Sequence, residues 1–492
     1  MGFSTRRSTS SAEKEKLAAS KVANKDEEGG FVSSGPDDVE QNAAPGTVEV
    51  DGVFGATPAD GEGPNYRSVG WISTSILLMK SQIGLGVLSI PSTFSTLGLA
   101  PGIIILVVIA ALTTYCDYFI GKFKLHHPTV YSVADCGYIM FGPIGREIFG
   151  IAYWLLMCLI VGSAIVGLST AINAISLHGA CTAIFVAVMA VAIYPFSALR
   201  TLGGVKWIGW VGLISILSAV LTVTIAVGVG GRPSLAPQEG PWDKNVVIWG
   251  QPTFAEAMTA VSNIVLAYAG TASFLPIAAE MRNQRDYKKA VLLCQGFVTL
   301  FYLAIGIAVY LKAGQYVASP ALGTAGTLLK RVSYGLALPG LLASGVIYAH
   351  LPAKYLFVRF LRGSRHLTAN TATHWITWLS CVLVCVLFAY VIASAVPVFE
   401  GLVGLVGALF GTFFSLQAVS MMWFFDYWKD RKDSKKNHLG FKLLVALNAF
   451  IIVAGFFLMV GGTYGSVLSI KKSYDENGGE AWSCADNSGS VQ

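Results

Sequence analysis

The stretch that decides the fold is "MKSQIGLGVLSIP", residues 79–91. It lies in an apolar segment long enough to cross a membrane, yet it carries Lys80, a glutamine and two glycines where a spanning helix normally has aliphatic residues. Backbone groups that a helix break exposes to lipid are costly unless they are satisfied. We therefore expect such a break only where it lines a cavity or meets a polar ligand.

A second interrupted segment reads "SNIVLAYAGTASFLPIAAE", residues 262–280. Its apolar run breaks at residues 269–273 and is followed by Pro276, much as Gly84 in the first segment is followed by Pro91. Each interrupted segment opens a set of five predicted spans. Two interrupted helices in corresponding positions of two halves are typical of an inverted repeat with a binding site at the membrane midplane.

The composition of the whole chain agrees with a membrane protein. Hydrophobic residues make up 54% of the 492 residues and charged residues only 13%, whereas a soluble domain carries about 25% charged residues. Apolar blocks of about 20 residues, the length that spans a bilayer, predict an all-α polytopic membrane protein with eleven transmembrane helices. These lie near residues 72–97, 101–121, 148–175, 180–198, 207–230, 253–279, 287–312, 334–360, 373–395, 397–425 and 440–464.

The chain divides into three predicted regions. Residues 1–66 are too polar to fold and form a cytosolic tail, residues 67–465 form the transmembrane domain, and residues 466–492 form a short extracytosolic tail. With the N-terminus in the cytosol, the inner connections hold nineteen Lys and Arg residues and the outer ones five, which is the orientation that the positive-inside rule favours. These basic residues are scattered, so we read them as orientation signals and expect no nucleic-acid partner.

The cysteines follow the same topology. Only Cys181 and Cys484 are expected to face outward together, and we consider a disulfide between them as a hypothesis. Motifs for phosphate loops, zinc proteases, serine hydrolases and dinucleotide binding are absent from the sequence. We therefore expect a transporter rather than an enzyme, with no cofactor and no metal site.

The two breaks also indicate the kind of substrate. A half-helix N-terminus offers free N–H groups to a carboxylate, and carbonyl groups freed at a break suit an ammonium group. An α-amino acid carries both charges. The sequence offers no further carboxylate or guanidinium close to the breaks, which favours neutral aliphatic or aromatic amino acids over charged ones.

Four stretches resemble the amino acid/auxin permease family, in particular its fungal neutral amino acid permeases. They are "IGLGVLSIP" (83–91), "AYAGTASFLPIAAEMRN" (267–283), "YGLALPGLLASGVIYAHLPAKYLFVRFLRGSRHL" (334–367) and "FEGLVGLVGALFG" (399–411). The resemblance covers about residues 68–465. It implies a fold like that of the bacterial leucine transporter, with a five-plus-five inverted repeat and an extra helix, and secondary active transport by alternating access.

The resemblance also implies a set of site residues. The substrate carboxylate is expected at the backbone of Ile83, Gly84, Leu85 and Gly86, and the amino group at carbonyls of Ala267, Tyr268 and Ala269. Tyr268 or Phe274, with Tyr153 or Trp154 opposite, would line the side-chain pocket unless these aromatic rings only fill the core. Gly270, Thr271 and Ser344 complete the candidate substrate site; family relatives have histidine at the Thr271 position.

Lys80 is the main candidate for ion coupling. It lies nine residues beyond Trp71, about 13 Å along a helix, where an ionisable residue is expensive and indicates function. In sodium-coupled relatives an asparagine one turn before the first glycine helps to bind the ion. Here Lys80 has that position, so we expect proton coupling and no sodium site. The alternative is a permanently charged lysine that fastens the first span to the eighth near Ser344.

Two other ionisable residues are candidates for coupling or gating. Glu280, at the inner end of the sixth span, either carries a proton or pairs with a basic residue in an inner gate. His350 either relays a proton or makes a structural hydrogen bond.

The predicted protein is a plasma-membrane importer with neutral amino acids and the lipid bilayer as partners. Cytosolic regulators of the N-terminal tail are further possible partners. Two alternatives remain open at this point: a vacuolar exporter of the same family, and an amino acid receptor that signals without transport.

Overall fold

The computed structural model describes residues 69–84, 86–199, 202–229, 232–367, 369–396, 399–429, 439–477 and 481–489. The predicted N-terminal tail, residues 1–66, and Leu85 of the candidate site lie outside the described residues. Within these ranges the regular elements are all helices, and the only β-type pairing is an isolated bridge between Val69 and Met281. The predicted all-α fold is therefore confirmed.

The helices follow the order of the predicted spans. They are α2 (Trp71–Gln82), η1 (Gly86–Ser89), α3 (Ile90–Leu97), α4 (Leu99–His126), α5 (Val133–Ser176), α6 (Thr182–Ser197), α7 (Leu202–Val229), α8 (Phe254–Ala267), α9 (Thr271–Ala279), η2 (Gln284–Asp286), α10 (Tyr287–Ala313), η3 (Gly314–Tyr316), η4 (Ala321–Thr324), α11 (Thr327–Leu361), η5 (Arg365–Leu367), α12 (Ala372–Ala395), α13 (Phe399–Val406), η6 (Gly407–Gly411), η7 (Phe413–Gln417), α14 (Ala418–Tyr427) and α15 (Leu439–Asn477).

The number of membrane spans differs from the prediction. In the described ranges nine helices are long and apolar enough to cross a membrane, and the bent pair of α2 with η1–α3 would make a tenth. Helix α6 corresponds to the predicted span 180–198, but its 16 residues fall short of crossing length. The count of eleven is therefore not confirmed, although each predicted span contains helix.

Both predicted helix breaks are present. Helix α2 ends at Gln82, and the chain resumes in the 3₁₀-helix η1 and in α3, which are bent by 41° from α2. Pro91 lies in the first turn of α3, where a missing N–H has no helical partner to lose. In the second broken span, α8 ends at Ala267 and α9 begins at Thr271.

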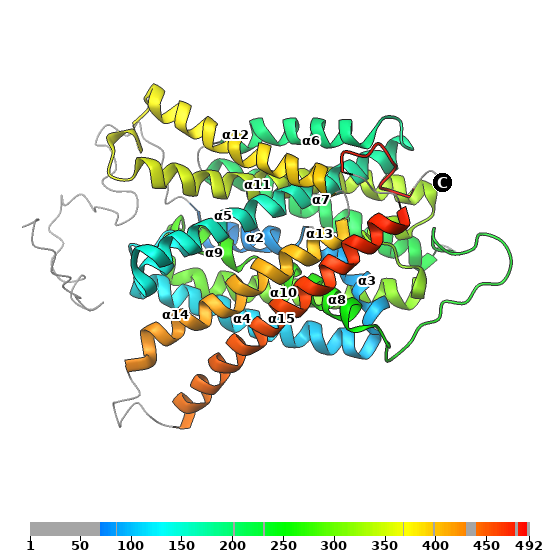
Figure 1. Ribbon diagram of the computed structural model, residues 1–492, viewed down its shortest axis with the longest axis horizontal. Helices are drawn as coiled ribbons and strands as arrows, with labels where there is room; N and C mark the ends of the chain where they lie inside the picture. Colours follow the sequence, from blue (N-terminus) through cyan, green and yellow to red (C-terminus); the bar gives the residue numbers. More distant parts are fainter. Residues whose placement is uncertain are drawn as a thin grey trace, which may run out of the picture. The chain divides into compact units, whose positions relative to one another are not determined.

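The two broken spans lie inside the bundle. Helix α2 packs against α7 and α10, α3 packs against α8 and α10, and α8 also packs against α13 and α15. Helix α15 packs on α8 and runs alongside α13 and α14, as Figure 1 shows. Large apolar side chains point outward from it, and Val453 and Phe457 are 69% and 59% exposed, as expected of a helix that faces lipid.

The tenth predicted span packs closely on the second broken one. It contains two π-helical turns, η6 and η7, between α13 and α14. A Cβ atom on Gly407 would lie 2.4 Å from the carbonyl oxygen of Ser262, and one on Gly411 would lie 3.3 Å from the Cβ of Ala269. These glycines therefore allow α13–η6 to approach α8 and its break.

The C-terminal segment is fastened to the helices. Cys181 and Cys484 form a disulfide, which confirms the pairing proposed from the sequence. Asn487 donates from its side chain to Ser169 Oγ at 3.0 Å and accepts from Asn173 Nδ2 at 2.8 Å. Helix α15 continues to Asn477, so part of the region predicted as a tail is helical.

Candidate functional site

The two helix breaks touch each other. A Cβ atom on Gly86 would lie only 2.4 Å from Ala267 Cα, and one on Gly270 would lie 2.8 Å from Ser81 Oγ. Real Cβ atoms essentially never come this close to another heavy atom, so glycine is required for the contact. The structure thus brings together the predicted site residues of both spans. These are Ile83, Gly84, Gly86, Ala267, Tyr268, Ala269 and Gly270, all of them buried.

Two tyrosines satisfy carbonyl groups that the breaks leave open. The Tyr302 hydroxyl, from α10, lies 2.8 Å from the carbonyl oxygen of Gln82 and 3.1 Å from that of Ala267, and so bridges both breaks. The Tyr348 hydroxyl, from α11, donates to the carbonyl oxygen of Ser81. The sequence analysis missed both residues, because a tyrosine in an apolar helix has the same pattern as an ordinary core residue.

Lys80 is buried beside the first break. Its side chain is 1% exposed, and its Nζ donates to Ser344 Oγ at 2.5 Å and to the carbonyl oxygen of Ile83 at 3.2 Å. Both of these acceptors are neutral. Gly84 leaves room for this arrangement, because a Cβ atom there would lie 2.8 Å from Ser344 Oγ. Lys80 thus links the end of α2 to α11 through a hydroxyl group.

Three of the aromatic residues predicted to line the pocket contact three different helices. Tyr268 points to α10, where its hydroxyl donates to Thr299 Oγ1 at 3.1 Å and its ring packs edge-on against Tyr302. Trp154 donates to Cys385 Sγ at 3.3 Å and so faces α12. Tyr153 packs edge-on against the Tyr355 ring, and its hydroxyl is buried without a hydrogen-bond partner.

Phe274 lies beside the second break. A Cβ atom on Gly270 would lie 2.8 Å from its ring. Phe274 is fully buried on the first turns of α9. Its ring therefore packs next to the broken backbone at Gly270.

Glu280 and His350 lie further along the same helices. Glu280 pairs with Lys354 of α11, and both side chains are at most 2% exposed. His350 Nδ1 lies 3.4 Å from the carbonyl oxygen of Ser197, and its ring packs edge-on against Trp378. The basic partner that the inner-gate hypothesis requires for Glu280 is thus Lys354, while His350 has structural contacts.

The N-terminal end of α2 lies beside this pair. Val69 N donates to the carbonyl oxygen of Glu280 at 3.2 Å, and Arg282 N donates to that of Val69 at 2.9 Å. The segment that enters the first span is therefore joined by its backbone to the end of the sixth span.

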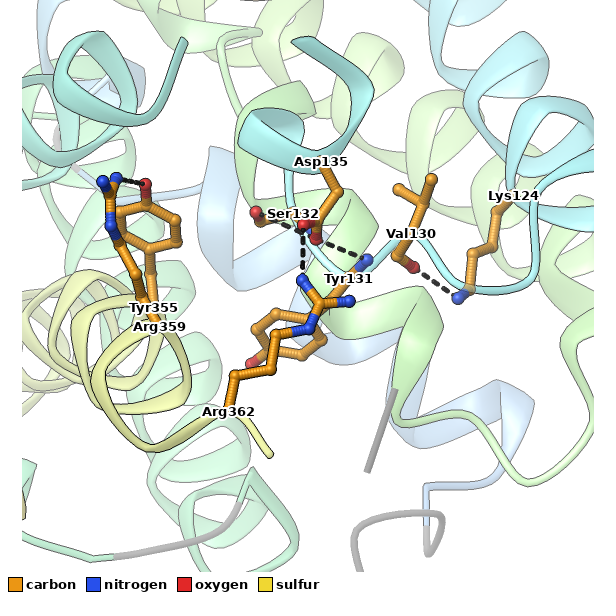
Figure 2. A network of polar contacts seen from close by, with 8 residues as sticks. All are labelled: Lys124, Val130, Tyr131, Ser132, Asp135, Tyr355, Arg359 and Arg362. Carbon is orange, nitrogen blue, oxygen red and sulfur yellow. Dashed lines mark hydrogen bonds and ion pairs between the residues drawn. The ribbon is translucent and has the colours of Figure 1, made fainter. Parts of the chain in front are cut away.

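A polar network surrounds the C-terminal end of α11 (Figure 2). Arg362 donates to Asp135 Oδ1 at 3.2 Å, and the other oxygen of Asp135 accepts from the backbone of Tyr131 and Ser132 at 3.0 Å. Arg359 donates to the Tyr355 hydroxyl at 3.0 Å. Lys124 donates to the carbonyl oxygen of Val130. The Arg362 contact ties α11 to the start of α5, and the Lys124 contact ties the end of α4 to the loop before α5.

One buried acid was not among the predicted site residues. Asp117 of α4 is fully buried and accepts a hydrogen bond from Gln295 of α10. It lies beside Thr271, the first residue of α9. Its position within the predicted span 101–121 could have identified it as a candidate, because ionisable residues within spans are rare and usually functional.

Comparison with known proteins decides the family. A family model described as "Transmembrane amino acid transporter protein" matches residues 67–468, which include both breaks and every site residue described above. The chain belongs to this family. Its role is therefore amino acid transport across a membrane, and the resemblance inferred from the sequence is confirmed.

Relatives of this transmembrane amino acid transporter support the assignment. It is 35% identical over 432 residues to a "Transmembrane transporter" of Gibberella moniliformis, with 88% of this chain and 90% of that protein covered. It is 32% identical over 446 residues to the "N amino acid transport system protein" of Neurospora crassa, with 88% and 92% covered.

A solved structure supports the fold. MhsT, determined in complex with L-phenylalanine, aligns with a TM-score of 0.55 and 11% identity, over 80% of this chain and 98% of that one. At this identity the likeness concerns the fold alone. The leucine-transporter-like architecture expected from the sequence is thereby confirmed for this transmembrane amino acid transporter.

Proposed function

We propose that this family member is a proton-coupled symporter that imports neutral L-amino acids across the plasma membrane. The observation that carries the proposal is the position of Lys80, whose Nζ contacts the Ile83 carbonyl and the Ser344 hydroxyl at the first helix break. An ammonium group there fills the space beside freed carbonyl oxygens and repels another cation. Coupling to sodium at this point is therefore disfavoured.

The surroundings of Lys80 favour a proton as the coupling ion. A buried ammonium group without a carboxylate partner is held only by its hydrogen bonds, because burial removes its hydration. When the first span moves away from α11, Lys80 loses the Ser344 contact. Loss of a proton in one conformation and its recovery in the other would couple proton movement to alternating access.

The substrate class follows from the site's other groups. The free backbone groups of two broken helices suit the carboxylate and ammonium groups of an amino acid. The candidate pocket residues Tyr153, Ser344 and Phe274 carry no charge, and the ammonium group of Lys80 is engaged by Ser344 and the Ile83 carbonyl, so neither is expected to match a charged substrate side chain. Asp117, a described carboxyl group beside the second break, lies between α4 and α10.

The import direction rests on topology. The excess of Lys and Arg in the connections expected to be cytosolic favours a cytosolic N-terminus. The disulfide between Cys181 and Cys484 favours an oxidising compartment for the opposite end. Both observations are also compatible with a vacuolar membrane, so the plasma membrane is the part of the proposal that localisation in intact cells must test.

The experiment is uptake of radiolabelled leucine and phenylalanine into sodium-free proteoliposomes, with and without an inward proton gradient. We expect accumulation above the external concentration only with the gradient. Lys80→Met should retain exchange of internal for external substrate but lose accumulation, whereas Lys312→Met, which removes an exposed lysine at the end of α10, should behave as the wild type. A requirement for sodium would refute the coupling proposal.

A further inference from the structure

Asp117 is a buried carboxyl group without a charged partner. It lies on α4 and is fully buried, and it forms no ion pair with any residue that the structure describes. Gln295 Nε2 donates to its Oδ2, while Asp117 Oδ1 and Gln295 Oε1 both lack a hydrogen-bond partner. Orphaned buried acceptors are rare in native proteins and call for an explanation.

A proton on the carboxyl group would explain this arrangement. An ionised carboxylate in the membrane interior is costly unless a cation or several donors compensate it. Gln295 supplies one neutral donor only. The protonated acid carries no charge, and its O–H is a donor that an acceptor such as Gln295 Oε1 can use.

The N-terminus of α9 lies beside this acid. Thr271 begins α9, and its hydroxyl is buried beside the Asp117 carboxyl group. The N-cap residue, Gly270, provides no side-chain cap. The first N–H groups of a helix carry a partial positive charge that stabilises a neighbouring carboxylate. A small shift of α9 towards α4 would therefore give an ionised Asp117 the donors that it lacks in this structure.

We propose that Asp117 is a second proton-binding group of the transport cycle. It is protonated when α9 has the position seen here, and ionised when the N–H groups at the N-terminus of α9 donate to its carboxylate. This inference rests on the proposed function, because it makes movement of the inner half of the sixth span depend on protons. Asp117 is a positioning residue here, since it acts on α9 rather than on the substrate.

The described groups that act electrostatically on Asp117 are the Cys116 thiol of α4 and the Tyr287 phenol and Cys294 thiol of α10, none of which can be positively charged. Helix α9 contributes the Thr271 hydroxyl. The charged groups of the adjoining elements have other contacts: Lys288 of α10 lies over the Tyr118 ring, Asp286 of η2 pairs with Lys289, and Asp426 of α14 contacts His126 and His127. Arg285 is the cation of η2, which also packs against α4.

The test measures amino acid exchange at equal internal and external pH, over a series of pH values, with no proton gradient. We expect the wild-type rate to show a pH-dependent step that Asp117→Asn abolishes and that Asp117→Glu retains at a shifted pH. Gln295→Leu, which removes the donor to the carboxyl group, should shift the step without abolishing it. Asp243→Asn, in an exposed loop, serves as the matched control and should leave the profile unchanged.

A spectroscopic readout keeps the proposal testable if a variant transports poorly. In infrared difference spectra taken on a change of pH, the wild type should show the stretching band of a protonated carboxyl group, which Asp117→Asn lacks and Asp117→Glu moves. The inference is overturned if Asp117→Asn leaves the pH-dependent step in the exchange rate, or the carboxyl stretching band, unchanged.

The two proposals fail in different ways. Wild-type accumulation driven by a proton gradient, together with an exchange profile that Asp117→Asn does not alter, overturns the role of Asp117 alone. A step that depends on Asp117 in a protein that never accumulates substrate under a proton gradient overturns the symport proposal and keeps Asp117 as a proton-binding group.

Discussion

The ammonium nitrogen of Lys80 lies 2.5 Å from the hydroxyl oxygen of Ser344, which joins the end of α2 to α11 inside the bundle. The contact is made where the first span leaves its helix, and Gly84 is the residue that leaves space for it. The charge of Lys80, the helix break and the close approach of α2 to α11 therefore occur at the same place. Because the proposed transport cycle moves the first span relative to α11, this contact would form and break during alternating access.

Ser344→Ala tests this contact without altering the charge. The variant leaves Lys80 with the Ile83 carbonyl as its remaining described acceptor, and loss of a partner for a buried charged donor costs about 1–3 kcal/mol or more. We expect a lower Tm and weaker accumulation, with exchange retained. Ser344→Thr keeps the hydroxyl group and should restore accumulation if its methyl group fits; equal behaviour of Ser344→Ala and the wild type would show that the contact is dispensable.

Gly86→Ala should block transport through overpacking. Its Cβ would lie 2.4 Å from Ala267 Cα, which is backbone and cannot rotate away, and overpacking of this kind costs about 1–3 kcal/mol. Gly296→Ala in α10 is the matched control, because nothing lies within 4 Å of its added Cβ, and there alanine should stabilise the helix by about 1 kcal/mol. Thermal unfolding and substrate exchange measure both effects; normal exchange by Gly86→Ala would contradict the tight contact of the two breaks.

Tyr302→Phe should loosen both breaks at once. The variant removes the hydroxyl group that satisfies the carbonyls of Gln82 and Ala267, and unsatisfied buried acceptors cost about 1–3 kcal/mol. We expect a lower Tm and slower uptake. Tyr464→Phe removes a hydroxyl from an exposed tyrosine of α15 and should have little effect. If Tyr302→Phe and Tyr464→Phe have the same Tm, the Tyr302 hydroxyl does not stabilise the two breaks.

The Glu280–Lys354 pair should show strong coupling in a double-mutant cycle. Lys354→Met removes the ammonium group from the buried pair with Glu280, and breaking a buried pair costs about 3–5 kcal/mol. The double variant Glu280→Gln/Lys354→Met removes both charges and should recover much of the lost Tm. If the double variant instead loses as much Tm as the two single variants together, the pair contributes little to closing this end of the transporter.

The breaks and their order could be predicted from the sequence because their signals are local. Gly84 followed by Pro91, and Gly270 followed by Pro276, interrupt apolar runs in a way that a chain in lipid tolerates only at a site. Lys80 was found by the same logic, since a charge deep in a span is conspicuous. The glycines of the tenth span also leave a local signal, since small residues spaced along an apolar helix allow the close packing seen at Gly407 and Gly411.

The partners across the bundle could not be predicted, because they depend on which helix faces which. Nothing in the sequence around Tyr302 or Tyr348 distinguishes them from core tyrosines. The pairing of Glu280 with Lys354 depends on where α11 passes the end of α9. Family likeness predicts Trp154 and Tyr268 in the side-chain pocket, and the structure adds their hydrogen-bond partners, Cys385 of α12 and Thr299 of α10. Asp117 had a signal within its span that the sequence analysis did not use.

The measurement that tests proton coupling most directly is substrate-driven proton entry. Sodium-free proteoliposomes with an entrapped pH indicator, at equal internal and external pH, receive leucine on the outside. The account predicts internal acidification that follows leucine uptake and that is absent in Lys80→Met, although Lys80→Met still exchanges leucine. Leucine entry without acidification in the wild type, or unchanged acidification in Lys80→Met, would contradict the coupling role assigned to Lys80.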